Sequence, residues 1–182
     1  RPLDASAAQR RVELYHALYH ARLRAELDAI KAQFGFAVLV AGHSMPSAVR
    51  RGPRELERRA DIVPCTLSRT SADARVIHEV ETFFRAAGLS VRHDEPYRGG
   101  FTTAHYGRPN DGVHAIQIEV NRALYMDERT CEPKSGDFEK LQCLLQGMVE
   151  RLGQLDLRPG RSLARSRSGL RMGPGVRSHH PR

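Results

Sequence analysis

The residues best suited to metal binding or acid–base chemistry lie at or near predicted strands, and His43 is the first of them. It sits in Gly42-His43-Ser44, directly after the apolar run 36–40. A neutral imidazole at such a strand end can bind a metal or act as a general base, and Gly42 allows a tight turn beside a ligand. A histidine that only caps a loop would give the same pattern, so both interpretations stay open.

Glu119 is the second candidate, because it lies between Ile118 and Val120 in the alternating segment 113–121. Burying a carboxylate is costly unless the group is paired or functional. A partly desolvated glutamate suits general acid–base catalysis near neutral pH. An ion pair between Glu119 and Arg122 on an exposed sheet face explains the pattern equally well.

The loop 95–110 is too long for a simple connection, which makes it a candidate binding loop. Its start, Pro96-Tyr97-Arg98-Gly99-Gly100, places a guanidinium beside two glycines. This combination can present cationic and backbone N–H groups to a carboxylate. A hairpin turn with a solvated Arg98 is the alternative.

Several other chemistries find little support in the sequence. His16 and His20 are one helical turn apart, but Ala17 stands where an H-E-x-x-H zinc motif needs its glutamate. The three cysteines form no C-x-x-C pair, which argues against a disulfide framework or a cysteine-built zinc site. P-loop, dinucleotide and G-x-S-x-G motifs are also missing.

Hydrophobic periodicity predicts the elements that must position these residues. The apolar run 36–40 is typical of a strand buried on both faces of a parallel sheet. Helices and strands alternate along the chain, which predicts an α/β domain with helices on both faces of the sheet. In such sheets reactive groups gather beyond the carboxyl ends of the strands. The expected elements are a helix over 8–33 with Tyr15, Tyr19, Leu23, Leu27 and Ile30 on its apolar face, the strand 36–40, a short strand 61–63, a helix capped by Ser71 and ended by Gly88, a strand 89–91, the strand 113–121 and a helix 137–155.

The positive charge is concentrated at one end of the sequence. The 182 residues carry 29 Lys+Arg against 21 Asp+Glu, a net charge of +8. Residues 158–182 hold seven Arg and no acid, so residues 1–157 have 22 basic against 21 acidic residues, a net charge of +1. The sequence therefore predicts one near-neutral domain over 1–157 and a basic, disordered tail over 158–182. Binding of nucleic acid or an acidic surface through that tail is a rival function.

The chain also has no apolar run near the roughly 20 residues that a bilayer requires, and no secretory signal. A membrane-spanning protein is therefore excluded, and a cytoplasmic location is expected. The oligomeric state stays open.

Taken together, these segments resemble the N-formylglutamate amidohydrolases, also called N-formylglutamate deformylases. The matching blocks cover residues 10 to about 155, and the last two are quite specific. They are YHALYHARLRAEL, FGFAVLVAGHSMPS, RADIV, PYRGGFTTAHYGRP and HAIQIEVNRALYMDE. The resemblance implies a metal-dependent hydrolase with zinc as cofactor and a three-layer α/β/α fold with a mostly parallel sheet, like that of the zinc exopeptidases. The implied reaction is hydrolysis of N-formyl-L-glutamate to formate and glutamate, a step of histidine degradation.

Carried over to this chain, the resemblance implies a role for each candidate. His43 would be a zinc ligand, and Glu119 the catalytic base or a carboxylate beside the metal. Arg98 and Arg122 would hold the substrate carboxylates, with Tyr97 and Gln117 also expected to contact the substrate.

The chain departs from the family pattern at four places. Family members carry a further stretch before this region, with a histidine motif expected to supply metal ligands, whereas a catalytic zinc normally needs three protein ligands. Ala41 stands where the family usually has an acidic residue, and Pro64-Cys65-Thr66 replaces a Gly-Asp-Arg-like turn. The arginine-rich tail has no family counterpart. A non-catalytic remnant of the family is therefore a further alternative.

Overall fold

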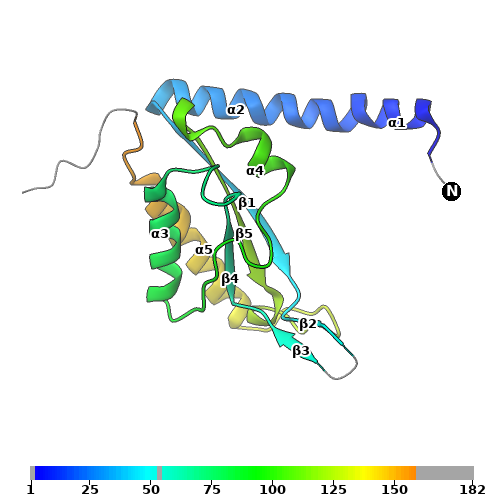
Figure 1. Ribbon diagram of the computed structural model, residues 1–182, viewed down its shortest axis with the longest axis vertical. Coiled ribbons are helices and arrows are strands. Elements are labelled where there is room, and N and C mark those ends of the chain that lie inside the picture. The colour runs from blue at the N-terminus through cyan, green and yellow to red at the C-terminus, as the bar shows by residue number, and fades with distance from the viewer. Residues whose placement is uncertain (1–2, 53–54, 159–182) are drawn as a thin grey trace, which may run out of the picture.

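A three-stranded sheet forms the centre of the molecule, and Figure 1 shows its strands running side by side. The computed structural model describes residues 3–52 and 55–158. The strand order is β1 (Ala37–Met45), β5 (Val113–Asn121), β4 (Ile62–Cys65). β1 and β5 are parallel, with Ala37 opposite Val113 and Met45 opposite Asn121. β4 is antiparallel to β5, so the α/β fold is confirmed but the sheet is mixed rather than mostly parallel.

One face of the sheet packs against α3 (Ala74–Ala86) and α5 (Asp137–Gly153), which lie on the same side of the strands. Alternate residues of β5 point to this face, because side chains of a strand alternate between its two sides. The buried cluster contains Ile116, Ile118 and Val120 of β5, Val76, Val80 and Phe84 of α3, and Met148 and Leu152 of α5. This is the main hydrophobic core.

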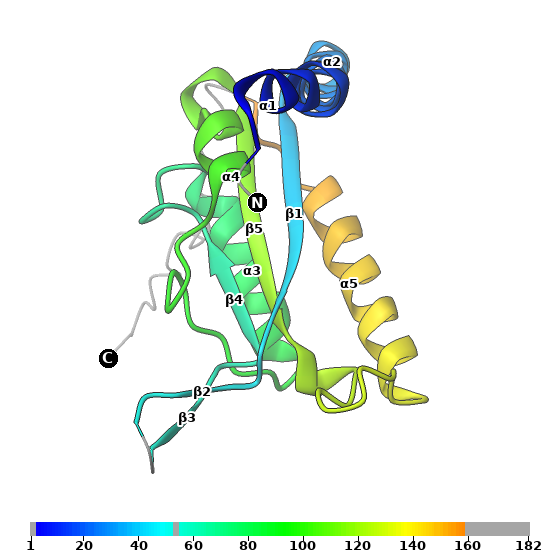
Figure 2. The same ribbon diagram turned by 90° about the vertical axis from the view of Figure 1, so that its right-hand side faces the viewer.

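The opposite face is covered near its upper end by α4 (Phe101–Tyr106) and by α2 (Leu18–Phe34). Tyr106 and Leu27 pack there against Ala37, Val113 and Ala115. α1 (Ala5–Arg11) and a π-helical turn (Val12–Ala17) precede α2, and Figure 2 shows this helix lying across the end of the sheet. Toward the carboxyl ends of the strands, loop residues replace the helices on this face.

The prediction that the first strand is buried on both faces is wrong. Only Ala37 and Met45 of β1 are buried, since among the described strands β1 pairs with β5 alone and so lies at the edge of the sheet. The strand is also longer than predicted, so Gly42-His43-Ser44 belongs to it rather than to a following loop.

Other element boundaries differ from the predictions for identifiable reasons. The N-cap of α3 is Asp73, whereas the hydroxyl of Ser71 donates to the Ala115 carbonyl at 2.7 Å. The predicted strand 89–91 is reduced to one bridge between Val91 and Ile62. Between β1 and β4 the chain forms an antiparallel hairpin of β2 (Ala48–Arg50) and β3 (Leu56–Arg58), which was not predicted. Short 3₁₀ turns also occur at Pro109–Asp111 and Arg122–Leu124.

The long first helix is confirmed, but most of its predicted buried face is exposed. Gly35 ends it with a left-handed φ of 84°, a conformation that glycine adopts without strain. Leu27 is buried and Leu23 half-buried, while Tyr15 and Tyr19 are 70% and 60% exposed. None of the described helices is long and apolar enough to cross a bilayer. The predicted disordered tail lies outside the described residues, apart from Arg158 at its start.

Candidate functional site

Strand register brings the two principal candidates together. His43 of β1 lies opposite Glu119 of β5, and parallel strands in register project paired side chains to the same face of a sheet. The Nδ1 atom of His43 is 3.8 Å from Oε1 of Glu119. The His43 side chain is 51% exposed and that of Glu119 only 8%. The pair therefore joins a buried carboxylate to an imidazole that solvent and ligands can reach.

Gln117 orients the Glu119 carboxylate from the same face of β5. Its Nε2 donates a hydrogen bond to Oε1 of Glu119 at 2.8 Å, and its own Oε1 accepts from the backbone N–H of Gly100 at 3.1 Å. Both side chains are buried. Gln117 thus couples the carboxylate to the glycine-rich loop, and the polar face predicted for this strand is covered rather than exposed.

The alternative interpretation of Glu119, an ion pair with Arg122, is wrong, because no such pair forms in the described part of the chain. Arg122 directs its Nε to the hydroxyl of Ser44, 3.2 Å away. Ser44 follows His43 directly in β1. Because neighbouring side chains of a strand alternate between its two faces, this contact places the Arg122 cation at the carboxyl end of β1, on the opposite face from His43.

Arg98 and Tyr97 come from the loop that crosses this face, and they differ in their contacts. The Arg98 side chain is exposed and makes no ion pair or hydrogen bond with another described residue. The Tyr97 hydroxyl accepts a hydrogen bond from Arg59, whose guanidinium lies 5.0 Å above the tyrosine ring. The Tyr97 ring also packs on Met45 and Val63. Arg98 is thus available to a ligand, whereas Tyr97 mainly holds the loop.

A buried thiol fixes the loop to the sheet. Burial, and then the negative charges of Glu119 and Asp94, raise the pKa of Cys65 to about 12. The thiol consequently keeps its proton, and its Sγ donates to the Tyr97 carbonyl at 3.1 Å. Cys65 is therefore a structural contact of the site rather than a nucleophile.

A strained turn that the sequence did not reveal supports the same loop. Leu67, Ser68 and Arg69 have φ values of 52°, 59° and 66°, and each left-handed non-glycine residue costs on the order of 1 kcal/mol. The Asp94 carboxylate accepts the backbone N–H groups of Thr66 at 2.8 Å and Ser68 at 2.6 Å. The Leu67 N–H then donates to the Arg98 carbonyl at 2.8 Å.

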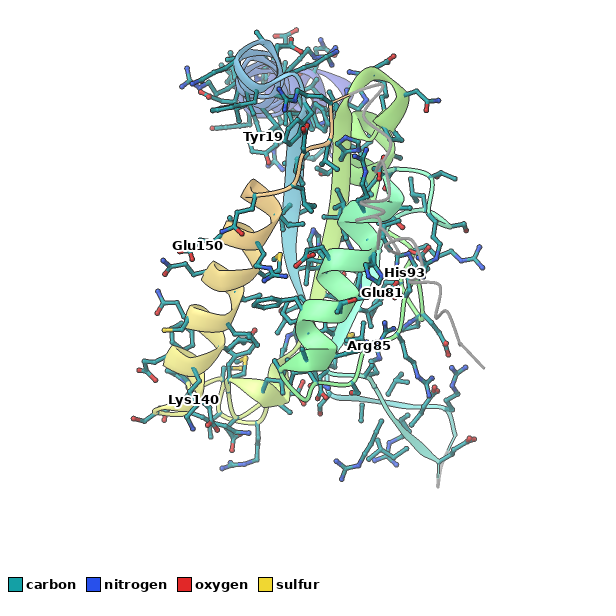
Figure 3. All side chains as sticks on the ribbon, turned by 90° about the vertical axis from the view of Figure 1, so that its left-hand side faces the viewer. Tyr19, Glu81, Arg85, His93, Lys140 and Glu150 are labelled. Atoms are coloured by element: carbon teal, nitrogen blue, oxygen red, sulfur yellow. The ribbon has the colours of Figure 1, made fainter. Side chains whose placement is uncertain are left out.

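Behind this turn lies a second group of charged residues from α3 and the following loop, and Figure 3 shows Glu81, Arg85 and His93 close together. Glu81 accepts hydrogen bonds from Arg69 at 2.7 Å and from Arg85 at 3.0 Å. Burial alone would raise the pKa of Glu81, but these hydrogen bonds outweigh it and hold the pKa below its usual value. His93 bonds the Thr66 hydroxyl through Nε2 at 2.7 Å. Its pKa is lowered, mainly by burial.

The histidines of the first helix form a different cluster from the candidate site. The rings of His16 and His20 are tilted to each other with centroids 4.3 Å apart, and His20 Nδ1 is 2.6 Å from the Tyr106 hydroxyl. His105 lies 6.0 Å from His20 between ring centroids. Within residues 3–52 and 55–158, however, no three His, Cys, Asp or Glu side chains come together as a metal site. This holds for the helix cluster and equally for His43 and Glu119.

Comparison with known proteins identifies a family model and relatives that agree with one another. A family model described as N-formylglutamate amidohydrolase matches residues 1–126. The N-formylglutamate deformylase of Pseudomonas aeruginosa is 33% identical over 137 residues, which are 74% of this chain and 50% of that protein. The Pseudomonas putida deformylase is 33% identical over 112 residues, 60% of this chain and 41% of that protein. The chain thus spans about half the length of the curated relatives it matches.

Solved structures agree with the sequence matches. The crystal structure of N-formylglutamate amidohydrolase from Ralstonia eutropha superposes with a TM-score of 0.76 at 31% identity, covering 87% of this chain and 57% of that one. A protein of Agrobacterium tumefaciens shares the fold with a TM-score of 0.58 at 22% identity, covering 83% of this chain and 56% of that chain.

Proposed function

Because the chain belongs to the N-formylglutamate amidohydrolase family, we propose that it supplies the catalytic carboxylate for hydrolysis of N-formyl-L-glutamate to formate and glutamate. The observation that carries this proposal is the pairing of Glu119 with His43 across adjacent parallel strands. A three-layer α/β/α arrangement of the complete domain, a cytoplasmic location and a role in histidine degradation belong to the same proposal.

The proposed reaction needs one group that moves a proton, and Glu119 fits that role. As general base its carboxylate takes a proton from a water molecule while the water oxygen attacks the formyl carbon. The C–N bond then breaks, and the protonated Glu119 returns the proton to the departing amine nitrogen. The hydrogen bond from Gln117 occupies Oε1, which leaves Oε2 for the water.

The two candidate cations suit a substrate with two carboxylates. Arg98 is exposed on the loop above Gln117, and Arg122 lies beside Ser44 at the end of β1. We propose that these guanidiniums bind the substrate carboxylates through charge-assisted hydrogen bonds. Gln117 and Tyr97 would then line the space between them.

Zinc remains part of the proposal, with His43 as its ligand. An imidazole nitrogen and a carboxylate oxygen are donors that zinc accepts, but catalytic zinc sites use three protein ligands. The described residues do not provide a third ligand beside this pair. The residues present therefore do not complete a zinc site, and the proton-transfer steps above are assigned to Glu119 alone. Zinc analysis of the purified chain and of His43→Ala after dialysis tests the ligand role: zinc that the unmodified chain retains and His43→Ala loses would support it, and equal zinc contents would refute it.

Formate release from N-formylglutamate, with zinc in the buffer, tests the proposed reaction. Glu119→Gln removes the proton acceptor but keeps the side chain's size, so turnover should fall roughly 10²–10⁴-fold. Glu150→Gln makes the same change on the exposed surface of α5 and should leave turnover unaltered. Unchanged turnover in Glu119→Gln would refute the role of Glu119. Absence of formate release by the unmodified chain would leave it as a non-catalytic family member.

A further inference from the structure

Several arginines that the proposed reaction does not use gather where the β2–β3 hairpin meets the loop that follows α3. Figure 2 shows the hairpin projecting from the end of the sheet opposite α2. The two segments border a hollow of about 400 Å³, which we call the arginine pocket. Five arginines and two glutamates give its lining a formal charge of +3. The arginines are Arg50, Arg51, Arg58, Arg59 and Arg92, and the glutamates are Glu57 and Glu95.

The two glutamates are already paired with arginines, but both pairs are exposed. Glu57 accepts a hydrogen bond from Nε of Arg51, and the two side chains are 36% and 60% exposed. Glu95 lies 3.0 Å from Nη1 of Arg92, and these side chains are 65% and 58% exposed. Exposed ion pairs contribute little to stability, because water solvates both partners well. An anion that binds in the pocket can therefore replace either carboxylate as the partner of its arginine.

The other two arginines next to β4, Arg58 and Arg59, form no ion pair within the described residues. The Arg58 side chain is exposed and makes no hydrogen bond there either. The Arg59 guanidinium is partly buried: Nη1 donates to the neutral Tyr97 hydroxyl, and Nε is buried without an acceptor. Buried N–H groups normally have a partner, and leaving a charged donor without one is especially costly. The Arg59 cation is thus held in place with no anion to neutralise it.

A phosphate group matches this arrangement better than a single carboxylate does. Guanidiniums bind both groups through parallel N–H donors, but a phosphate offers three acceptor oxygens. Arg51, Arg59 and Arg92 come from three different segments, so they can reach different oxygens of one ligand. The hollow has the size of a small-molecule site, since such sites begin at roughly 300 Å³. We propose that the arginine pocket binds a small phosphate-bearing anion.

Arg59 connects the arginine pocket to the loop of the candidate site. Its guanidinium lies 5.0 Å above the Tyr97 ring, and Tyr97 packs on Val63, which is opposite Glu119 in the sheet. Arg98 follows Tyr97 directly. An anion bound to Arg59 would therefore fix the cation that holds this loop and would stabilise the folded chain. Anion binding itself does not depend on the proposed hydrolysis.

Calorimetric titration of inorganic pyrophosphate onto the full chain tests the proposal, at roughly 0.15 M ionic strength to screen weak surface attraction. We expect saturable binding of one pyrophosphate per chain and a rise in Tm. Arg59→Gln should weaken binding at least about tenfold, because a charge-assisted contact is lost. Arg22→Gln makes the same change on the exposed face of α2, at the other end of the molecule in Figure 1, and should change the affinity by less than about twofold. Residues 158–182 are present in every variant, so a loss confined to the pocket variants reports the pocket.

A double variant separates anion binding from a disturbed loop. Arg58 and Arg92 make no contact with Tyr97 by hydrogen bond, ion pair or ring, so replacing them should leave the loop in place. Arg58→Gln together with Arg92→Gln should weaken pyrophosphate binding about tenfold, roughly threefold for each exposed cation.

Four results would overturn the proposal. The first is the absence of saturable pyrophosphate binding. The second is equal weakening by Arg22→Gln and by the pocket variants, which would assign binding to general positive charge. The third is weakening by Arg59→Gln with none in the double variant, which would reflect only the disturbed loop. The fourth is displacement of pyrophosphate by an equal concentration of N-formylglutamate, which would make the arginine pocket part of the substrate site.

Discussion

Asp94 shows how a residue remote from the reacting groups can set their geometry. Its side chain, 12% exposed, accepts two backbone N–H groups of the strained turn that follows β4. That turn donates to the carbonyl of Arg98, a proposed substrate-binding residue. Asp94 itself has a φ of 55°, which Asp and Asn tolerate better than most residues.

Replacing Asp94 should therefore destabilise the fold in a graded way. Asp94→Ala leaves two N–H groups without an acceptor and should lower the free energy of unfolding by about 2–3 kcal/mol. Asp94→Asn keeps one acceptor oxygen and should cost roughly half as much. Urea unfolding measures both, with the exposed Asp111→Ala as a control expected to change stability by less than about 0.5 kcal/mol. Equal losses for Asp94→Ala and Asp111→Ala would show that Asp94 does not hold the turn.

Residue types predicted the two principal residues of the site but not Asp94 and the turn that hold the neighbouring loop. Glu119 stood out because a carboxylate interrupts an apolar strand, and His43 because it follows an apolar run. Asp94 gave no such signal, since its partners are backbone groups 26 and 28 residues earlier in the chain. Leu67, Ser68 and Arg69 adopt left-handed conformations without the glycine that usually marks them.

At the scale of elements, α3 depends on a single residue at its start. The Asp73 side chain accepts the N–H of Arg75 at 2.8 Å and also pairs with the Arg75 guanidinium at 2.9 Å. The Arg75 side chain is the main reason that the pKa of Asp73 falls to about 2. α3 carries Val76, Ile77 and Phe84 into the main core, so fraying of its first turn would expose that core.

This pKa predicts a pH-dependent stability difference. The pKa in the folded state lies below the unfolded value near 3.9, so the stabilisation by Asp73 is complete above about pH 4 and is lost as pH falls toward 2. Asp73→Ala should cost about 1–2 kcal/mol at pH 7. The difference in unfolding free energy between the unmodified chain and Asp73→Ala should become smaller as the pH falls from 4 to 2. A difference that stays constant with pH would show that the ionised Asp73 side chain does not stabilise α3. Asp28→Ala, on the exposed middle of α2, serves as the control.

Hydrophobic periodicity correctly predicted the elements that pack in the main core. The helix over 137–155 is confirmed as α5, and the strand 113–121 is confirmed to the residue. β1 was misjudged because an apolar run reports a tendency to be buried, whereas actual burial depends on which strands lie beside it. The exposed Tyr15 and Tyr19 of the first helix illustrate the same point.

At the scale of the whole molecule, the chain comprises a mixed sheet with a well-packed core on one face and the candidate site on the other. The core of β5, α3 and α5 is built from residues within the described chain. Among the described strands, β1 forms one edge of this sheet. Nothing in the composition of β1 distinguishes an edge strand from a central one, so its edge position could not be predicted from the sequence.

The central claim is that His43 and Glu119 act as one catalytic unit. A double-mutant cycle on formate release tests it most directly, comparing kcat/KM of the unmodified chain, His43→Ala, Glu119→Gln and the double variant. Residues that act as a unit give strongly non-additive losses. The double variant should lose no more than about twofold beyond Glu119→Gln alone. Losses that instead multiply would show that the two residues act independently and would contradict the claim.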